Sequence, residues 1–416
     1  MTERTLLANG RVLTCSGGPD ERLLDADVLL EADRIVAVGP GRLDADPASA
    51  RVVDLGGATV LPGLGDAHTH ISWPLDFVFD HAAVAAAPEG KHLLDVAAIT
   101  RTFLESGYTL IIGAGVTQEL DDLLAKDFID RGYIPGPHIV PSGAMIAEAG
   151  GLGGEGHMMD VAANASDLRE IVARQCDKGV RALKLFISGD GVVPEHPSQD
   201  VYMNDEMLTA AVEEADKYGA FLTAHARGSA SVAMAARTGV RIIHHACFLD
   251  DEALREIEAR GDDVWVCPGL HYLYAVVSGH AEPWGITAER VDAWGYRQEL
   301  SAQIDGLKIL SAAGVQILSG GDFGHQWTRH GTYAAEMQRY VELVGMTPAA
   351  AIHTATRHMG PAAKRRSGQV REGFLADLFV VEGDPTTDVT VLQRPECRRA
   401  VIKDGAFAWV NPEAYP

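Results

Sequence analysis

The sequence predicts an α/β protein in which a parallel (β/α)8 barrel is joined to a small β-sandwich domain. Two observations support this fold class. The middle of the chain alternates apolar, strand-like runs with segments of helix length, and both chain ends contain short strands separated by Gly, Asp and Pro. Strand–helix alternation repeated eight times is typical of a parallel barrel. A chain of 416 residues has room for such a barrel and an accessory domain.

The two chain ends are predicted to form the β-rich domain together. The N-terminal strands are expected at 5–8, 11–14, 27–31, 34–38 and 58–61, and the C-terminal strands at 375–381 and 399–403. Asp404-Gly405, before a further apolar run, is a hairpin signal. The expected domain limits are therefore 1–60 plus 369–416 for the sandwich and 61–368 for the barrel.

The barrel strands are expected at eight apolar runs: 60–70, 109–114, 138–142, 181–186, 221–226, 241–246, 263–268 and 315–322. Between them, stretches such as 204–218 and 251–260 carry apolar residues at three-to-four spacing, which predicts helices. The long aromatic connection 269–290 is expected to be a loop, because connections of that length at this end of a barrel usually serve function.

The composition bounds the partners and the compartment. A formal net charge of −23 disfavours nucleic acid and anionic membranes, which require basic patches. Five scattered cysteines without a CxxC pair argue against a disulfide framework and suggest a reducing compartment. The start of the chain lacks the pattern of a signal peptide, and no run approaches the ~18 apolar residues of a membrane helix. A cytoplasmic location and a small-molecule substrate are expected.

Polar residues stand where five of the runs end. His68 and His70 share one face of the first strand, so both can reach one ion. The other polar ends are Lys184, His225, His245 and Asp322. A lone HxH pair or a buried lysine is often structural, but five such strand ends are hard to obtain by chance, since catalytic residues gather at this end of barrels. Imidazole and carboxylate groups predict Zn²⁺ or a similar divalent ion.

These motifs resemble those of the amidohydrolase superfamily, in particular its imidazolonepropionase-like branch, which includes metal-dependent, prolidase-like dipeptidases. The resemblance covers nearly the whole chain. It is carried by LANGRVLT, VLPGLGDAHTH, KLFISGDG, TAHARG, HGTYAAEM, MTPAAAIHTAT and REGFLADLFVV. Together these motifs are specific for the superfamily and much less so for a substrate.

The resemblance implies two divalent metal ions, expected to be Zn²⁺. His68, His70 and Asp322 would bind the more buried α ion, and His225 and His245 the β ion. Lys184, carrying a CO2-derived carbamate, would bridge them, which is chemically reasonable because burial near cations favours a neutral amine. Two cations lower the pKa of a bridging water to about neutrality. Asp322 would be the catalytic residue that carries the proton of the resulting hydroxide to the leaving nitrogen.

The sequence departs from the relatives' pattern at three points. A TGGHG-like segment is replaced by 149–153, and His157 could substitute for its histidine or be an ordinary loop residue. Arg227 stands where many relatives have His and should face the pocket. It could bind a substrate carboxylate or form a salt bridge at the barrel mouth, and the sequence favours neither. His244 stands where relatives commonly have Glu, and strand alternation is expected to turn it away from the ions.

Four further residues are candidates for substrate binding. His271 and Tyr272 lie in the long connection after the seventh run, and His325 and His330 follow Asp322 closely. Packing or hydrogen bonding within the loops would explain these residues equally well.

The function predicted from these residues is hydrolysis of an amide-type C–N bond in a small molecule by a metal-bridged hydroxide. An N-acyl amino acid, a dipeptide, or a xenobiotic amide, carbamate or urea would fit, and a homo-oligomer is compatible with the sequence. One alternative is a mononuclear deaminase of a heterocycle. Lys184 argues against this alternative, because mononuclear relatives lack the bridging lysine. The other alternative is a catalytically inactive barrel scaffold. The complete set of expected ligands argues against it.

Overall fold

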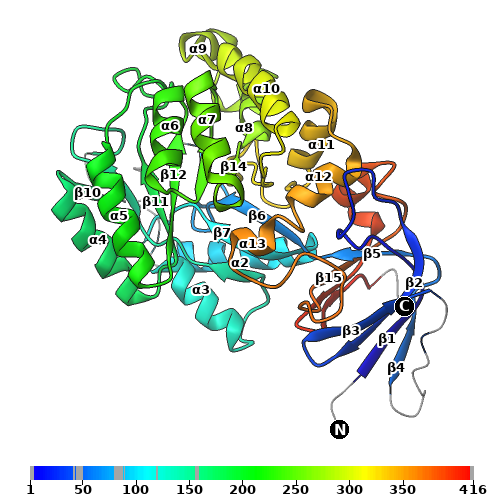
Figure 1. Cartoon of the computed structure of the whole chain (residues 1–416). Helices are drawn as coiled ribbons and strands as arrows, with labels where there is room; N and C mark the ends of the chain where they lie inside the picture. The colour runs from blue at the N-terminus through cyan, green and yellow to red at the C-terminus, as the bar shows by residue number, and fades with distance from the viewer. Residues whose placement is uncertain are drawn as a thin grey trace.

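A computed structural model describes residues 4–40, 43, 50–78, 88, 90–118, 120–154 and 159–412. In Figure 1 the blue N-terminal strands and the red C-terminal strands lie together, beside a larger part in which helices surround parallel strands. The predicted α/β class is confirmed.

The strands from the two chain ends form one mixed sheet. They are β1 (Arg4–Val12), β2 (Leu24–Glu31), β3 (Arg34–Gly39), β4 (Arg51–Asp54), β5 (Thr59–Pro62), β15 (Leu378–Val381), β16 (Arg398–Lys403) and β17 (Ala406–Val410). Their order is β17-β16-β15-β5-β1-β2-β3, with β4 beside β1. The two ends meet where β15 pairs with β5 in antiparallel register. The arrangement of these strands as a two-layer sandwich is not confirmed.

The expected hairpin at Asp404-Gly405 joins β16 to β17. Both loop residues have positive φ, 51° at Asp404 and 76° at Gly405. Two consecutive positive φ values are what a type I′ turn requires, and this turn matches the right-handed twist of paired strands. The hairpin prediction is therefore confirmed.

The remaining strands form two parallel sheets. One has the order β10-β9-β11-β12-β13-β14 and the other β6-β7-β8. Their bounds are β6 (Leu64–Thr69), β7 (Tyr108–Gly113), β8 (His138–Val140), β9 (Met145–Glu148), β10 (Met159–Ala162), β11 (Ala182–Phe186), β12 (Phe221–Ala226), β13 (Ile242–His245) and β14 (Trp265–Cys267). Single parallel bridges join Val116 to Ala144, Thr69 to Phe323 and Val266 to Ile317. The eighth expected run, 315–322, takes part only through such bridges, so a continuous closed barrel is not detected among the described residues.

Helices follow most of the parallel strands. They are α2 (Lys91–Glu105), α3 (Asp121–Asp130), α4 (Ala165–Lys178), α5 (Asp205–Lys217), α6 (Ser229–Thr238), α7 (Asp251–Arg260), α8 (Leu270–Val277), α9 (Ala288–Ala293), α10 (Tyr296–Ala312), α11 (Ala335–Arg339), α12 (Pro348–Thr354) and α13 (Met359–Ala362). The predicted helices at 204–218 and 251–260 are confirmed as α5 and α7. Each begins at a capping side chain, Asn204 and Asp250, that accepts a hydrogen bond from a backbone N–H of the first turn.

The expectation of a long loop at 269–290 is wrong. Most of its first half is helix α8, and a short 3₁₀ helix covers Glu282–Trp284. Six of the eight residues of α8 are buried. A helix that is apolar nearly all round has no polar face, so the three-to-four periodicity that reveals surface helices is absent from its sequence.

The expected first barrel strand is divided between the two parts of the molecule. Gly63 separates β5, in the terminal sheet, from β6, in a parallel sheet. A Cβ atom at Gly63 would lie 2.1 Å from the Thr109 Oγ1 atom, so the close approach of the Thr109 side chain to this backbone requires glycine here. The strand that carries His68 is thereby joined directly to the terminal sheet.

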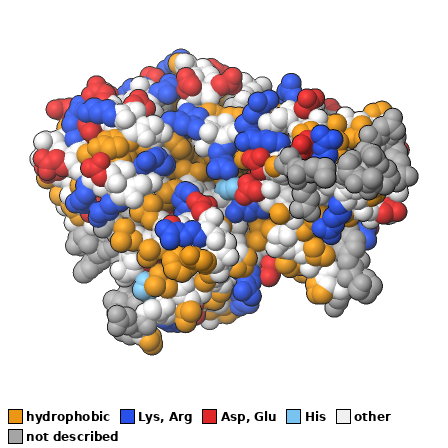
Figure 2. All heavy atoms as spheres, turned by 90° about the horizontal axis from the view of Figure 1, so that it is seen from below, with side chains coloured by type: hydrophobic (Ala, Val, Ile, Leu, Met, Phe, Trp, Pro, Cys, Tyr) orange, Lys and Arg blue, Asp and Glu red, His pale blue; other side chains and the backbone are white. Residues whose placement is uncertain are grey.

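Acidic and basic side chains are interspersed on the face shown in Figure 2, with hydrophobic side chains between them. All five cysteines are free thiols, in agreement with the prediction that no disulfide framework is present. Within the described ranges, no helix is both long and apolar enough to span a bilayer.

Candidate metal centre

Three of the predicted ligands converge at the end of β6. The Asp322 Oδ1 atom lies 3.3 Å from His70 Nε2 and 3.6 Å from His68 Nε2, and all three side chains are buried. His70 donates from Nδ1 to the Gly115 carbonyl oxygen at 3.1 Å, which leaves the Nε2 lone pair directed at Asp322. A hydrogen bond from the far nitrogen is how proteins orient metal-binding histidines. The potential ligand atoms of His68, His70 and Asp322 are close enough to share one ion.

The ionisation states of these groups suit a cation. Burial raises the pKa of Asp322, but His70, His325 and Lys184 together lower it more, to about 2. Burial and the neighbouring His244 lower the pKa of His68 well below its ordinary value. At neutral pH the site therefore offers an anionic carboxylate and a neutral imidazole with a free lone pair, as metal ligands require.

Lys184 lies at the centre of the site, near the end of β11. Its side chain is 1% exposed, and its Nζ atom lies 3.4 Å from His68 Nε2 and 2.6 Å from His244 Nδ1. Burial lowers the pKa of the ammonium group to about 7, despite the opposing field of Asp322. A substantial fraction of Lys184 is therefore a neutral amine at physiological pH, which is the nucleophilic form.

His225 and His245 lie together on the other side of the site. Their ring centroids are 4.4 Å apart, and the His245 ring is 5.0 Å from that of His68. His225 donates from Nε2 to the Gly189 carbonyl oxygen at 3.1 Å, leaving the Nδ1 lone pair for a ligand. Burial lowers the pKa of His225 to about 3 and that of His245 well below its ordinary value. These two neutral imidazoles are candidate donors for a second cation.

The expectation that His244 faces away from the site is wrong. His244 pairs in register with His225 across β12 and β13, and laterally paired residues of a parallel sheet share a face. Strand alternation would instead turn His245 outward. His245 and Ala246 have φ values of 70° and 47°, so the backbone leaves the extended region here and returns His245 to the same side. Both histidines therefore face the centre.

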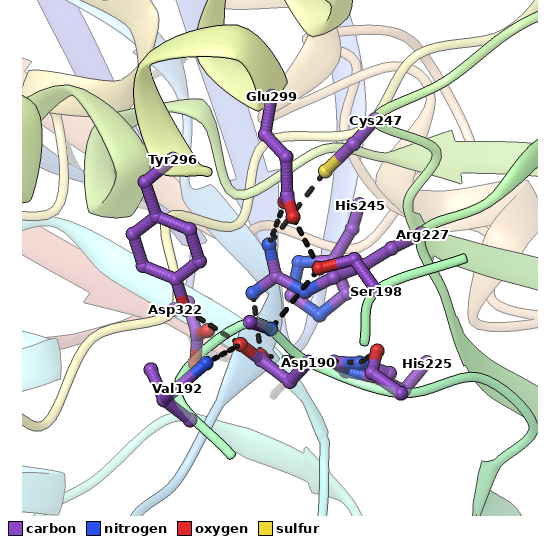
Figure 3. Close-up of polar contacts among 12 residues, drawn as sticks. Asp190, Val192, Ser198, His225, Arg227, His245, Cys247, Tyr296, Glu299 and Asp322 are labelled. Atoms are coloured by element: carbon purple, nitrogen blue, oxygen red, sulfur yellow. Dashed lines mark hydrogen bonds and ion pairs between the residues drawn. The ribbon is translucent and has the colours of Figure 1, made fainter. Parts of the chain in front are cut away.

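Arg227 lies in a buried ion-pair network that the sequence did not reveal (Figure 3). Its guanidinium group contacts Asp190 and Glu299, each at 2.8 Å, and its side chain is 1% exposed. Tyr296 donates from its hydroxyl to Asp190 Oδ1 at 2.6 Å, and Ser198 donates to Glu299. The salt-bridge alternative for Arg227 thus describes its contacts, whereas a role in binding a substrate carboxylate stays a prediction.

The two carboxylates respond differently to this arrangement. Burial raises the pKa of Asp190, but Arg227, His225 and the hydrogen bond from Tyr296 together lower it more, so Asp190 is the more firmly ionised partner. Burial keeps the pKa of Glu299 above its ordinary value in spite of Arg227. Asp190 Oδ2 also lies 4.0 Å from His225 Nε2, which links this network to the candidate β-metal ligands.

Arg227→Met is expected to lower the free energy of unfolding by about 3–5 kcal/mol, because it leaves two buried carboxylates without their cation. Arg237→Met is the matched control. Arg237 forms an exposed pair with Asp205 at 2.8 Å, and exposed pairs contribute only about 0–1 kcal/mol. Denaturant titration of both variants measures the difference.

Adding Asp190→Asn and Glu299→Gln to Arg227→Met should recover much of the lost stability. Kinetics test the separate prediction of substrate binding. A fall in kcat/KM of about ten- to 150-fold on carboxylate-bearing substrates only would show that Arg227 contacts them. An equal fall on neutral analogues would leave Arg227 with its structural role.

The other predicted substrate residues have separate surroundings. The His325 ring lies 4.7 Å from Trp73, 4.9 Å from Trp327 and 5.1 Å from Tyr272. Because Trp73 itself stacks on His70 at 3.7 Å, these rings form an aromatic wall beside the α-site ligands. This places His325 and Tyr272 near the site.

His271 and His330 make contacts with nearby loop and helix residues. The backbone N–H of His271 donates to Glu336 at 2.6 Å, and its ring lies 5.6 Å from that of Phe323. His330 Nδ1 is 3.1 Å from the hydroxyl of Tyr333, so hydrogen bonding within the loop accounts for it. His157 lies outside the described residues.

Asp190, Glu299 and Trp73 were not singled out from the sequence. Asp190 stands within the KLFISGDG motif, so its position beside the fourth strand was a usable signal. Glu299 comes from α10, 72 residues after Arg227, and no local pattern could pair them. Trp73 follows GDAHTH closely, where an aromatic residue that can stack on a ligand histidine could have been suspected.

Parallel α/β architecture with buried histidines, a lysine and an aspartate at strand ends defines a class of metal-dependent hydrolases. The chain belongs to the amidohydrolase family, whose model matches residues 59–407. It is therefore a hydrolase that acts on C–N bonds, and this family generally uses divalent metal ions.

Individual relatives are distant but cover most of the chain. Ochratoxinase from Aspergillus niger is 26% identical over 379 residues, which span 83% of this chain and 75% of the relative. Imidazolonepropionase from Cereibacter sphaeroides is 26% identical over 442 residues, covering 97% and 99%. The crystal structure of a prolidase complexed with N-methylphosphonate-L-proline is similar with a TM-score of 0.86 and 25% identity, covering 98% of this chain and 100% of the prolidase.

Proposed function

We propose that this protein uses two divalent cations to hydrolyse an amide-type C–N bond of a small molecule. In this proposal the site lies at the mouth of a (β/α)8 barrel formed by residues 61–368. A composite β domain of residues 1–60 and 369–416 flanks the barrel. One observation carries the proposal. His68 Nε2 lies 3.6 Å from Asp322 Oδ1 and 3.4 Å from Lys184 Nζ, so one imidazole joins a histidine–aspartate set to the lysine. A carboxylated Lys184 would bridge two ions, whereas a site for a single ion needs no bridging group.

The donor chemistry of the site fits two cations. His68, His70 and Asp322 would hold one, and His225 and His245 the other, with carboxylated Lys184 between them. Lowered pKa values keep His68, His225 and His245 neutral, and His70 and His225 donate from their far nitrogens to backbone carbonyl oxygens. Nitrogen and oxygen donors of this kind favour Zn²⁺. When bound, such cations polarise a carbonyl oxygen and lower the pKa of water.

The residues of the chain supply the proton transfer. Ionised Asp322 accepts a proton at its carboxylate from the attacking water and delivers it to the leaving nitrogen, which must be protonated to depart. Burial of the ligands keeps bulk water from competing for these protons.

An N-acyl amino acid, a dipeptide, or a xenobiotic amide, carbamate or urea remains the proposed substrate class. The wall formed by Trp73, Tyr272, His325 and Trp327 provides apolar surface for a substrate group next to the scissile bond. The similarity to ochratoxinase and to a prolidase supports an amide substrate of this size.

Metal stoichiometry tests the proposal. Protein stripped with a chelator and reloaded with Zn²⁺ should bind two ions per chain and hydrolyse at least one member of a panel of N-acyl amino acids, dipeptides, aryl amides and ureas. Elemental analysis and product chromatography measure both. One ion per chain with release of ammonia from heterocyclic amines would instead establish the deaminase. Protein that neither binds metal nor hydrolyses any compound would establish the scaffold.

A further inference from the structure

His244 is a buried, polar residue of the site that the proposed reaction does not use. It is fully buried, and it lies between the lysine and one of the α-site histidines. Its Nδ1 atom is 2.6 Å from Lys184 Nζ, and its ring stacks on His68 with centroids 4.0 Å apart and an interplanar angle of 9°.

The hydrogen bonds of His244 fix its tautomer. Its Nε2 atom lies 3.2 Å from the Ala67 carbonyl oxygen, which can only accept, so Nε2 carries the hydrogen. In the neutral ring Nδ1 is then the acceptor, and Lys184 Nζ must be the donor. Both nitrogens are thus engaged, which argues against His244 as a direct ligand although it lies near His68 and Cys267.

We propose that His244 is a positioning residue that holds the Nζ atom of Lys184 in the orientation needed for carboxylation and for bridging. The proposal rests on the proposed function. Lys184 has a long, flexible side chain, and its amine would otherwise be free to rotate among several positions. The Ala67 carbonyl anchors the His244 ring, and the ring anchors the amine.

The carboxylation itself requires only CO2. The lone pair of neutral Lys184 Nζ forms a bond to the carbon of CO2, one C=O electron pair moves onto oxygen, and one N–H proton leaves to water. One N–H remains on the carbamate nitrogen, and this hydrogen can still be donated to His244 Nδ1. Retention of that hydrogen bond would fix the plane of the carbamate and therefore the direction of its two oxygens.

The experiment compares two substitutions of similar size. His244→Asn keeps an acceptor close to the position of Nδ1, whereas His244→Leu removes it. The full-length protein is loaded with Zn²⁺ in ¹³C-labelled bicarbonate, and the lysine carbamate carbon is followed by NMR, together with bound zinc. His244→Phe keeps ring stacking on His68 without an acceptor. His358→Phe, which removes a half-buried ring that is hydrogen-bonded to the Ile317 carbonyl, is the control away from the site.

The Leu and Phe variants should need about three- to tenfold more bicarbonate for half-maximal carbamate signal, as expected for loss of one hydrogen bond. The Asn variant and His358→Phe should remain within about twofold of wild type. Wild-type behaviour of the Leu variant would overturn the proposal, as would equal losses in the Asn and Leu variants. If the Phe variant does not fold, the Asn–Leu comparison still decides.

The result also separates this proposal from the proposed function. Two zinc ions and a carbamate signal in wild type, unchanged by His244→Leu, would overturn the role of His244 and leave the proposed dinuclear hydrolase intact. A wild-type protein with one zinc ion and no carbamate signal would overturn both.

Discussion

Lys184→Ala should lose at least one of the two metal ions per chain and about 10³-fold or more in kcat. The physical reason is that the alanine cannot carry the bridging carboxylate, and a cation that acts as a Lewis acid lowers the reaction barrier by several kcal/mol. Elemental analysis and steady-state kinetics on the same preparation measure the two effects together. Short carboxylic acids should restore part of the activity by occupying the space left beside His68.

Lys364→Ala is the control for loss of a lysine elsewhere, because Lys364 is exposed and donates to the backbone oxygens of Gly219 and Ala220 outside the site. It should retain its metal and its turnover. Full metal content and normal turnover in Lys184→Ala would remove the bridging lysine from the mechanism.

Asp322→Asn should lower kcat by about 10²–10⁴-fold, the usual contribution of a general acid–base residue. The amide keeps the size of the side chain and an oxygen that can approach a cation, but it cannot accept a proton. Because the low pKa of Asp322, about 2, keeps the wild-type carboxylate ionised at neutral pH, the substitution removes a base that is present throughout the assay range. KM should change little.

Bound metal must be measured in the Asp322→Asn preparation, since lost metal would also reduce kcat. Asp122→Asn is the control: Asp122 is a buried aspartate that accepts hydrogen bonds from Ser142 and Gly143 and is not one of the candidate ligands. It should affect stability rather than turnover. Near wild-type kcat in metal-replete Asp322→Asn would exclude a proton shuttle at this position.

The convergence of the candidate ligands could be predicted because it depends on local rules. His68 and His70 share a strand face, and the ends of parallel strands meet at one edge of the fold, so five strand ends suffice to propose a site. His244 was placed wrongly because alternation holds only while the backbone stays extended, and the positive φ of His245 cannot be read from the letters HH.

Most of the remaining differences between the predictions and the structure concern contacts between residues that are far apart in the sequence. The partners of Arg227 come from the segment after β11 and from α10, and only the folded chain shows that both reach one guanidinium group. Helix α8 was read as a loop because burial on nearly all sides removed the alternation between polar and apolar residues. The strand-like run 60–70 is divided between two sheets at Gly63, and no break in its apolar character marks the division.

The pairing of β5 with β15 has a consequence for biosynthesis. These strands are separated by more than 300 residues, yet β5 precedes the histidine-bearing β6 by a single glycine. Contacts between such distant segments form late, because a long loop must close before they are made. The β5–β15 pair can form only after β15 has been synthesised. The segment that carries His68 and His70 therefore reaches its final surroundings late in biosynthesis, long after its own residues have been made.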